Sequence, residues 1–145
     1  MTKNFISLDV EQNGLGGKTY AVAMVVYRDG EVVAQLCLSC PIESLNEPVS
    51  DWLIQNPELQ VVDGSTVCSY EQMLAYSAKF YKQFAQLDDE LNHVTKWGYP
   101  DYNATRVLYH CGMVCEGSFF NELVSNGLLG QFERPMAPIE VADYL

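Results

Sequence analysis

The chain has 145 residues, of which 48% are apolar, and this size and composition are typical of one folded domain with its own core. Its formal net charge is −11, from 19 acidic and 8 basic side chains. This balance excludes the large basic patch with which most nucleic-acid-binding proteins hold phosphates. Three explanations stay open: metal ions mediate a contact with nucleic acid, the partner is a basic protein, or the charge serves solubility alone.

No membrane span and no disulfide framework are expected. The longest apolar run, Tyr20 to Tyr27, is far shorter than the roughly 20 residues that cross a bilayer. The N-terminus lacks the apolar stretch of a signal peptide, so we expect a cytoplasmic protein. The five cysteines are an odd number. Zinc binding by Cys37 and Cys40 with Cys111 and Cys115 is an alternative, but residues three apart on a strand point to opposite faces, which favours small buried side chains.

The first third of the chain predicts three antiparallel strands. Phe5–Val10 is typical of a strand with a buried apolar set, and the glycine-rich turn Asn13–Gly17 follows it. Tyr20–Tyr27 is apolar throughout, which indicates a strand in the middle of a sheet. Arg28-Asp29-Gly30 is a hairpin signal and leads to a third strand, Glu31–Leu38. The opening is therefore predicted to be an antiparallel three-stranded meander.

Helices are expected in the middle of the chain. A short helix, Ser50–Gln55, precedes Pro57, which ends it. Ser69 and Gln72 have the spacing of a capping box, and a long helix from there to about Leu87 should follow. Its apolar stripe has helical spacing and is interpreted as core: Tyr70, Met73, Leu74, Ser77, Phe80, Tyr81, Phe84 and Leu87.

The last third is expected to return to the sheet once and then form helices. Asn92–Trp97 is predicted to be a fourth strand, and a helix is expected to start near Asp101. Ser118–Ser125 predicts another helix with Gly127 at its C-terminal end, and Ile139–Leu145 is either strand or helix. The order βββ, α, β, α, α is that of a ribonuclease-H-like α/β fold, in one domain covering residues 1–145.

Asp9 and Glu11 carry the clearest chemical signal. They are two positions apart at the end of an apolar strand, so both carboxylates should project to the same face. Mg²⁺ is held in proteins by one or two carboxylates together with substrate phosphate. Two such ions hold the attacking and leaving oxygens of a phosphodiester. The pair therefore predicts a site for Mg²⁺ or Mn²⁺.

The residues around this pair resemble a known family. Ser7–Gly17, Tyr20–Met24 and Asp29-Gly30 resemble the first motif and first hairpin of the DEDD-type exonucleases. The rest resembles a compact bacterial and phage branch of 3′–5′ exoribonucleases, at Pro41-Ile42-Glu43, Asp51-Trp52, Ser69-Tyr70-Glu71, Gly98-Tyr99-Pro100 and Pro138–Ala142. The resemblance implies a ribonuclease-H-like fold, two Mg²⁺ or Mn²⁺ ions and trimming of RNA 3′ ends, often by a homodimer. A phage-encoded member would act in the host cytoplasm.

The chain departs from the family pattern at the second and third motifs. Such enzymes need an aspartate on the strand before Gly98, where this chain has Lys96, and Asp101 is the nearest substitute. A rival register, ranked second, takes His110–Glu116 as the second motif with Glu116 as the ligand. The third motif should lie in a further helix, so we expect the chain to be a C-terminally shortened form.

Two functions of different classes follow. In the first, Asp9 and Glu11 bridge the ions, Asp101 or Glu116 adds a ligand, and the protein is a metal-dependent 3′–5′ exoribonuclease whose activity is weak or degenerate. In the second, an exonuclease-like scaffold no longer cuts, and its acidic surface occludes the basic groove of a host nuclease or defence complex. A third option is a subunit that takes its missing site residues from a partner.

Overall fold

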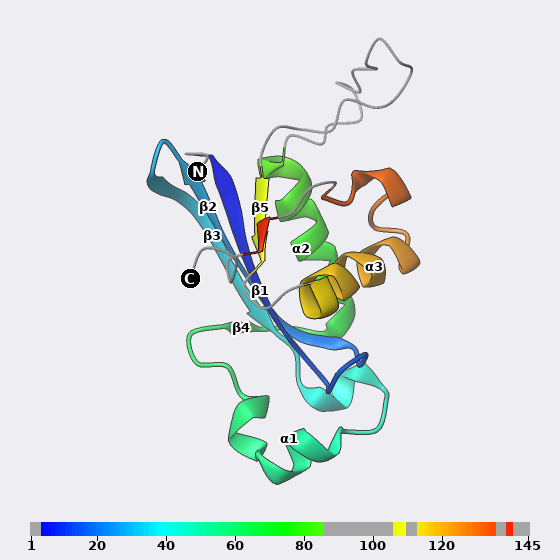
Figure 1. Cartoon of the computed structure of the whole chain (residues 1–145). Helices are drawn as coiled ribbons and strands as arrows, with labels where there is room; N and C mark the ends of the chain where they lie inside the picture. The colour runs from blue at the N-terminus through cyan, green and yellow to red at the C-terminus, as the bar shows by residue number, and fades with distance from the viewer. Residues whose placement is uncertain (1–3, 86–105, 110–112, 136–138, 141–145) are drawn as a thin grey trace.

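The computed structural model describes residues 4–85, 106–109, 113–135 and 139–140 (Figure 1). Within these ranges the chain is an α/β protein with one mixed sheet of strand order β4-β3-β2-β1-β5-β6. The strands are β1 (Phe5–Gln12), β2 (Thr19–Arg28), β3 (Glu31–Ser39), β4 (Thr66–Val67), β5 (Arg106–Tyr109) and β6 (Ile139–Glu140). The α-helices are α1 (Asp51–Gln55), α2 (Tyr70–Phe84) and α3 (Ser118–Ser125). None of these helices is long and apolar enough to cross a membrane.

The antiparallel meander expected at the start of the chain is confirmed. β1 pairs with β2 and β2 with β3, both antiparallel, and β2 lies inside the sheet. Asp29 and Gly30 both have positive φ, 53° and 83°, as the tight turn between β2 and β3 requires. The rings of Phe5 and Tyr27 stack across the β1–β2 pair with their centroids 4.5 Å apart. Asp29 and Gly30 therefore form the predicted hairpin turn between β2 and β3.

The strand beside β1 differs from the sequence prediction. β5 lies next to β1 and runs parallel to it, with Leu8 opposite Tyr109. We expected the fourth strand at 92–97 and a helix starting near Asp101. Residues 86–105 lie outside the described ranges, but that helix does not run through 106–109, which is extended. A strand of four residues is too short for periodicity to distinguish it from a helix.

The core lies between the sheet and the helices α2 and α3, which Figure 1 shows on the same side of the sheet. From β1 the buried face contributes Ile6, Leu8 and Val10, each at most 5% exposed. The expected stripe of α2 is confirmed for its fully buried members, Tyr70, Met73, Leu74, Ser77 and Tyr81. Phe80 and Phe84 are half-buried at the border of this core and stack on each other.

Both predicted helix ends are confirmed. Ser69 and Gln72 form the capping box of α2: Ser69 Oγ accepts from the Gln72 amide at 3.1 Å, and the Ser69 amide donates to Gln72 Oε1 at 3.1 Å. Gly127 has φ 72° just after α3, and the Leu128 amide donates back to Leu123 O at 2.9 Å. α2 is assigned to Phe84, and the expected extension to Leu87 lies outside the described residues.

Candidate functional site

Asp9 and Glu11 lie on the face of the sheet opposite the core. Side chains on a strand alternate, and the buried residues of β1 are Ile6, Leu8 and Val10. Asp9 is half-buried and Glu11 is exposed. Their cross-strand partners on β2 are Ala23 and Ala21, which add no charge and little bulk beside the carboxylates. Two positions along a strand correspond to about 7 Å, so both carboxylates can reach one hydrated ion.

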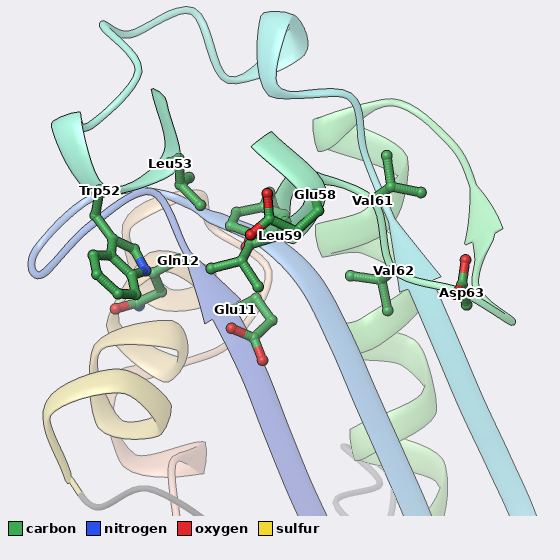
Figure 2. Close-up of a pocket in the computed structure, with 10 residues that line it drawn as sticks. Glu11, Gln12, Trp52, Leu53, Glu58, Leu59, Val61, Val62 and Asp63 are labelled. Atoms are coloured by element: carbon green, nitrogen blue, oxygen red, sulfur yellow. The ribbon is translucent and has the colours of Figure 1, made fainter. Parts of the chain in front are cut away.

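A hollow of about 350 Å³ lies at the Glu11 end of β1 (Figure 2). Its floor is formed by Glu11, Gln12 and Tyr20. Its other walls come from the segment 41–67 between β3 and the end of β4, which we call the roof segment. This segment contains α1 and two 3₁₀-helices, η1 (Ile42–Leu45) and η2 (Pro57–Gln60). The roof segment supplies the remaining lining side chains, Trp52, Leu53, Glu58, Leu59, Val61, Val62 and Asp63.

The glycine-rich turn after β1 holds the start of the roof segment in place. Asn13, only 6% exposed, donates from Nδ2 to Glu47 Oε1 at 2.8 Å and to Pro48 O at 2.9 Å. Its Oδ1 accepts from the Ser50 amide at 2.8 Å, which fixes the residue that caps α1. Gly14 has φ 73°, and a Cβ there would lie 2.9 Å from Ser50 Cβ. The turn therefore needs a glycine at this position for conformation and for space.

A second anchor joins the floor of the hollow to its far wall. Tyr20 is 2% exposed, and its hydroxyl donates to Leu59 O at 2.8 Å. Burial, and then the charge of Glu11, raise the pKa of this phenol to about 12. The hydroxyl is therefore protonated and able to donate throughout the neutral range. A register shift between Glu11 and Gln12 disrupts the β1–β2 ladder at this point, and such bulges often occur beside active sites.

The lining of the hollow is acidic and partly apolar. Glu11, Glu58 and Asp63 contribute carboxylates, and no lysine or arginine is among its lining side chains. Trp52 and Val61 are 62% and 73% exposed, which is unusual for side chains of their type and size. Such a hollow attracts a cation and offers an aromatic surface next to it.

Glu116 is brought to the same end of β1. It lies in a π-helical turn, η4 (Met113–Gly117), that follows β5 and precedes α3, and its side chain is fully buried. The Nε2 of Gln12 donates to Cys115 O at 3.2 Å, so this turn contacts the end of β1 directly. Single π-helical turns occur often at functional sites. Both second-motif registers stay predictions, because the residues of the other register, Lys96 and Asp101, lie outside the described ranges.

The other expected site residues are not placed. Asp101, the substitute ligand expected for the second motif, lies outside the described ranges, as does Lys96. The strand expected at 92–97, with Lys96 in the second motif, therefore stays a prediction.

The carboxylates fit a hydrated ion but not a closed protein cage. In the part of the chain that the structure describes, no three His, Cys, Asp or Glu side chains come together as metal ligands. Mg²⁺ usually keeps several waters and uses one or two carboxylates plus substrate phosphates, which is what Asp9 and Glu11 offer. Cys37 and Cys40 do not converge: Cys37 pairs with Ala23 on the Asp9 face, and Cys40 is in the core.

Sequence reasoning missed Glu122, a carboxylate used by the fold. Its Oε1 accepts from Thr19 Oγ1 at 2.6 Å and from the Thr19 amide at 3.0 Å, and its Oε2 accepts from the Tyr70 hydroxyl at 2.7 Å. The side chain thus joins α3 to β2 and α2. The only signal in the sequence is its position, three residues after the buried Phe119 and so on the flank of the apolar stripe.

No protein-family model matches the chain, and no curated protein matches it.

Proposed function

We propose that the chain is a ribonuclease-H-like, metal-dependent 3′–5′ exonuclease that acts on RNA. The observation that carries the proposal is the placement of Asp9 and Glu11: both lie on one face of a central strand, away from the core, and an acidic and aromatic hollow opens beside Glu11. The chain order supports the fold assignment, since a meander, a long helix, a strand and a further helix follow one another as that fold requires.

The parallel pairing of β5 with β1 supports a third carboxylate at the site. The carboxyl ends of parallel strands point to the same edge of a sheet, so the residues after β5 arrive where β1 ends. Glu116 lies in η4, the next described element after β5, and the hydrogen bond from Gln12 to Cys115 O joins η4 to β1. In the proposed enzyme Asp9 and Glu11 hold the ion and Glu116 completes the acidic set. When bound, a divalent ion supplies Lewis-acid stabilisation of the charge on the phosphodiester.

The roof segment suits the end of a single strand. Trp52 offers an exposed aromatic face on the wall of the hollow that Glu11 also lines, and Leu59 extends the apolar wall. Stacking of a base on an aromatic side chain is worth roughly 1–3 kcal/mol and tolerates any base. The chain's own residues would therefore orient a terminal nucleotide by stacking, while the carboxylates bind the cation that accompanies its phosphate.

One observation favours the alternative function, a non-catalytic acidic protein that binds a basic partner. The hollow combines three carboxylates with an exposed tryptophan and lacks any basic lining side chain that would hold a phosphate. A lysine or arginine of a partner protein fits the same features through ion pairing and cation–π contact. In this alternative no ion and no RNA are required.

Single-turnover degradation of a 5′-labelled, single-stranded RNA, with excess protein and Mn²⁺, separates the two functions. The proposed enzyme shortens the RNA stepwise from its 3′ end, and Asp9→Asn and Glu11→Gln each reduce the rate at least about 100-fold. The matched control is Ser7→Ala, a neutral change on the same strand and face. Calorimetric titration with Mn²⁺ is the second measurement, with Asp9→Asn losing the binding that the wild type shows.

Two outcomes separate the proposed enzyme from its alternative. Metal binding without turnover supports the non-catalytic alternative, and identical titrations of the wild type and Asp9→Asn would exclude the ion site. The contribution of the roof segment is measured by RNA affinity in Trp52→Ala. Ile54→Ala is its control, because Ile54 is equally exposed on α1 but does not line the hollow. Stacking predicts a loss of about 5- to 150-fold for Trp52→Ala alone.

A further inference from the structure

Cys40 and Cys68 mark the two ends of the roof segment and are neighbours in the sheet. β3 and β4 pair in parallel, with Leu38 opposite Thr66 and Ser39 opposite Val67. The Cys68 amide continues this ladder and donates to Ser39 O at 2.9 Å. Cys40 and Cys68 are the next residues on the two chains, so they lie side by side one step beyond the last register pair.

Both cysteines belong to the same face. Alternation places Cys40 on the side of Leu38, which is the core side, and Cys68 on the side of Thr66, the partner of Leu38. Cys40 is 2% exposed within the core, and Cys68 is half-buried against it. Neighbouring strands are about 4.8 Å apart, which lies within the roughly 4.4–6.8 Å between Cα atoms that a disulfide requires.

We propose that Cys40 and Cys68 are a modification site, at which a small disulfide oxidant such as oxidised glutathione introduces an intrachain disulfide that closes the base of the roof segment. The thiolate of Cys68, the more accessible of the two, attacks the oxidant and releases one small thiol. The thiolate of Cys40 then attacks the Cys68 sulfur of the mixed disulfide and releases the second. Two protein thiols and one small disulfide thus become one protein disulfide and two small thiols.

The environment of the thiols decides how fast this reaction runs. Burial raises the pKa of both thiols, and the neighbouring Cys68, Glu122 and Glu71 raise that of Cys40 further, against the lowering effect of a hydrogen bond with Ser44. Because the thiolate is the nucleophile, the pair is stable as two thiols under mild conditions and exchanges faster as the pH rises.

The cross-link has a consequence for the hollow. The segment between the two cysteines carries Trp52, Glu58 and Leu59 and most of the other lining side chains. A disulfide at its base ties the two ends of the roof segment together and so reduces the number of conformations the segment can reach when it opens or unfolds. The oxidised protein should therefore hold its roof segment more rigidly than the reduced protein does.

Peptide mapping of the full chain by mass spectrometry tests the proposal. The native protein is incubated with oxidised glutathione at about pH 8.5, remaining thiols are alkylated, and the peptides are compared with those of the reduced protein. We expect the Cys40 and Cys68 peptides to be joined, the amides of residues 41–67 to exchange hydrogen more slowly, and the melting temperature to rise by about 5–10 °C. Cys68→Ser abolishes all three effects. Cys37→Ser, which changes a half-buried cysteine on the opposite face of β3, leaves them in place.

Two results would overturn the inference: glutathione retained on Cys68 without a cross-link to Cys40, or cross-links that join other cysteines instead. The cross-link is measured without RNA or metal, so the outcome is independent of the proposed function.

Discussion

The two faces of β1 are built for different purposes. On one face Ile6, Leu8 and Val10 are at most 5% exposed and contact the helices of the core. On the other face Asp9 is half-buried and Glu11 is exposed beside a hollow. A period of two separates them, so one strand both anchors the core and presents the carboxylates. The rigidity of the core face is what fixes the position of the acidic face.

Glu122 and Glu11 differ in the same way, since one carboxylate is bonded inside the fold and the other is exposed beside the hollow. Glu122 is half-buried and accepts three hydrogen bonds from Thr19 and Tyr70, so its charge is used inside the protein. Glu11 is exposed and lines an acidic hollow. A negative charge that the fold uses is surrounded by donors, whereas one placed with other carboxylates around a hollow suits a cation from outside.

Truncation in the core should have the largest effect. Met73 of α2 is fully buried, so Met73→Ala is expected to cost about 2–5 kcal/mol of unfolding free energy in urea titrations. Phe84 lies on the same helix but is half-buried, so Phe84→Ala should cost less, about 1–2 kcal/mol, and not the 3–5 kcal/mol of a fully buried phenylalanine. Equal losses in the two variants would mean that Phe84 belongs to the core.

Local signals predicted the fold where they were complete within a few residues. The Asp29-Gly30 turn, the Ser69 capping box and the stripe of α2 were each readable from the sequence, because each is determined by neighbours in the chain. β5 was not predicted. Four residues, Arg106–Tyr109, carry too little periodicity, and their strand conformation depends on pairing with β1, about a hundred residues earlier in the chain.

The same reasoning explains what was found of the site and what was not. The placement of Asp9 and Glu11 on one face of β1 was predictable because their spacing on one strand is a local pattern. The role of Asn13 was missed, because its partners Glu47, Pro48 and Ser50 come from the roof segment, and only the tertiary fold brings them together. The position of the second-motif ligand likewise depends on which strand lies beside β1, a pairing that is not local in the sequence.

Removal of the structural carboxylate should have an intermediate effect. Glu122→Ala leaves three donors without their acceptor, and we expect a loss of about 1–3 kcal/mol in unfolding free energy. Glu122→Gln keeps the shape and one acceptor oxygen and should cost less. A double-mutant cycle with Tyr70→Phe measures the pair directly, and strictly additive losses would contradict the hydrogen bond between the two side chains.

The smallest change in unfolding free energy should come from substitutions on the acidic face of β1. The sign of this change should depend on whether a divalent metal ion is present. Asp9 and Glu11 are about 7 Å apart along the strand, and like charges at that distance in water repel by about 0.5 kcal/mol. In EDTA and low salt, Asp9→Asn is therefore expected to stabilise the protein slightly, and high salt should screen most of the gain. Ser7→Ala, on the same face, is the neutral control.

Mn²⁺ should reverse the difference in stability between the wild type and Asp9→Asn. An ion that binds only the folded wild type at ten times its dissociation constant adds about 1.4 kcal/mol to the wild type's stability. A variant that does not bind the ion gains nothing, so Asp9→Asn should become the less stable protein by about 1 kcal/mol. Urea unfolding in EDTA and in Mn²⁺ measures both values. A variant more stable in both conditions would show that the carboxylates repel without binding an ion, and one less stable in both would give Asp9 a structural role like that of Glu122.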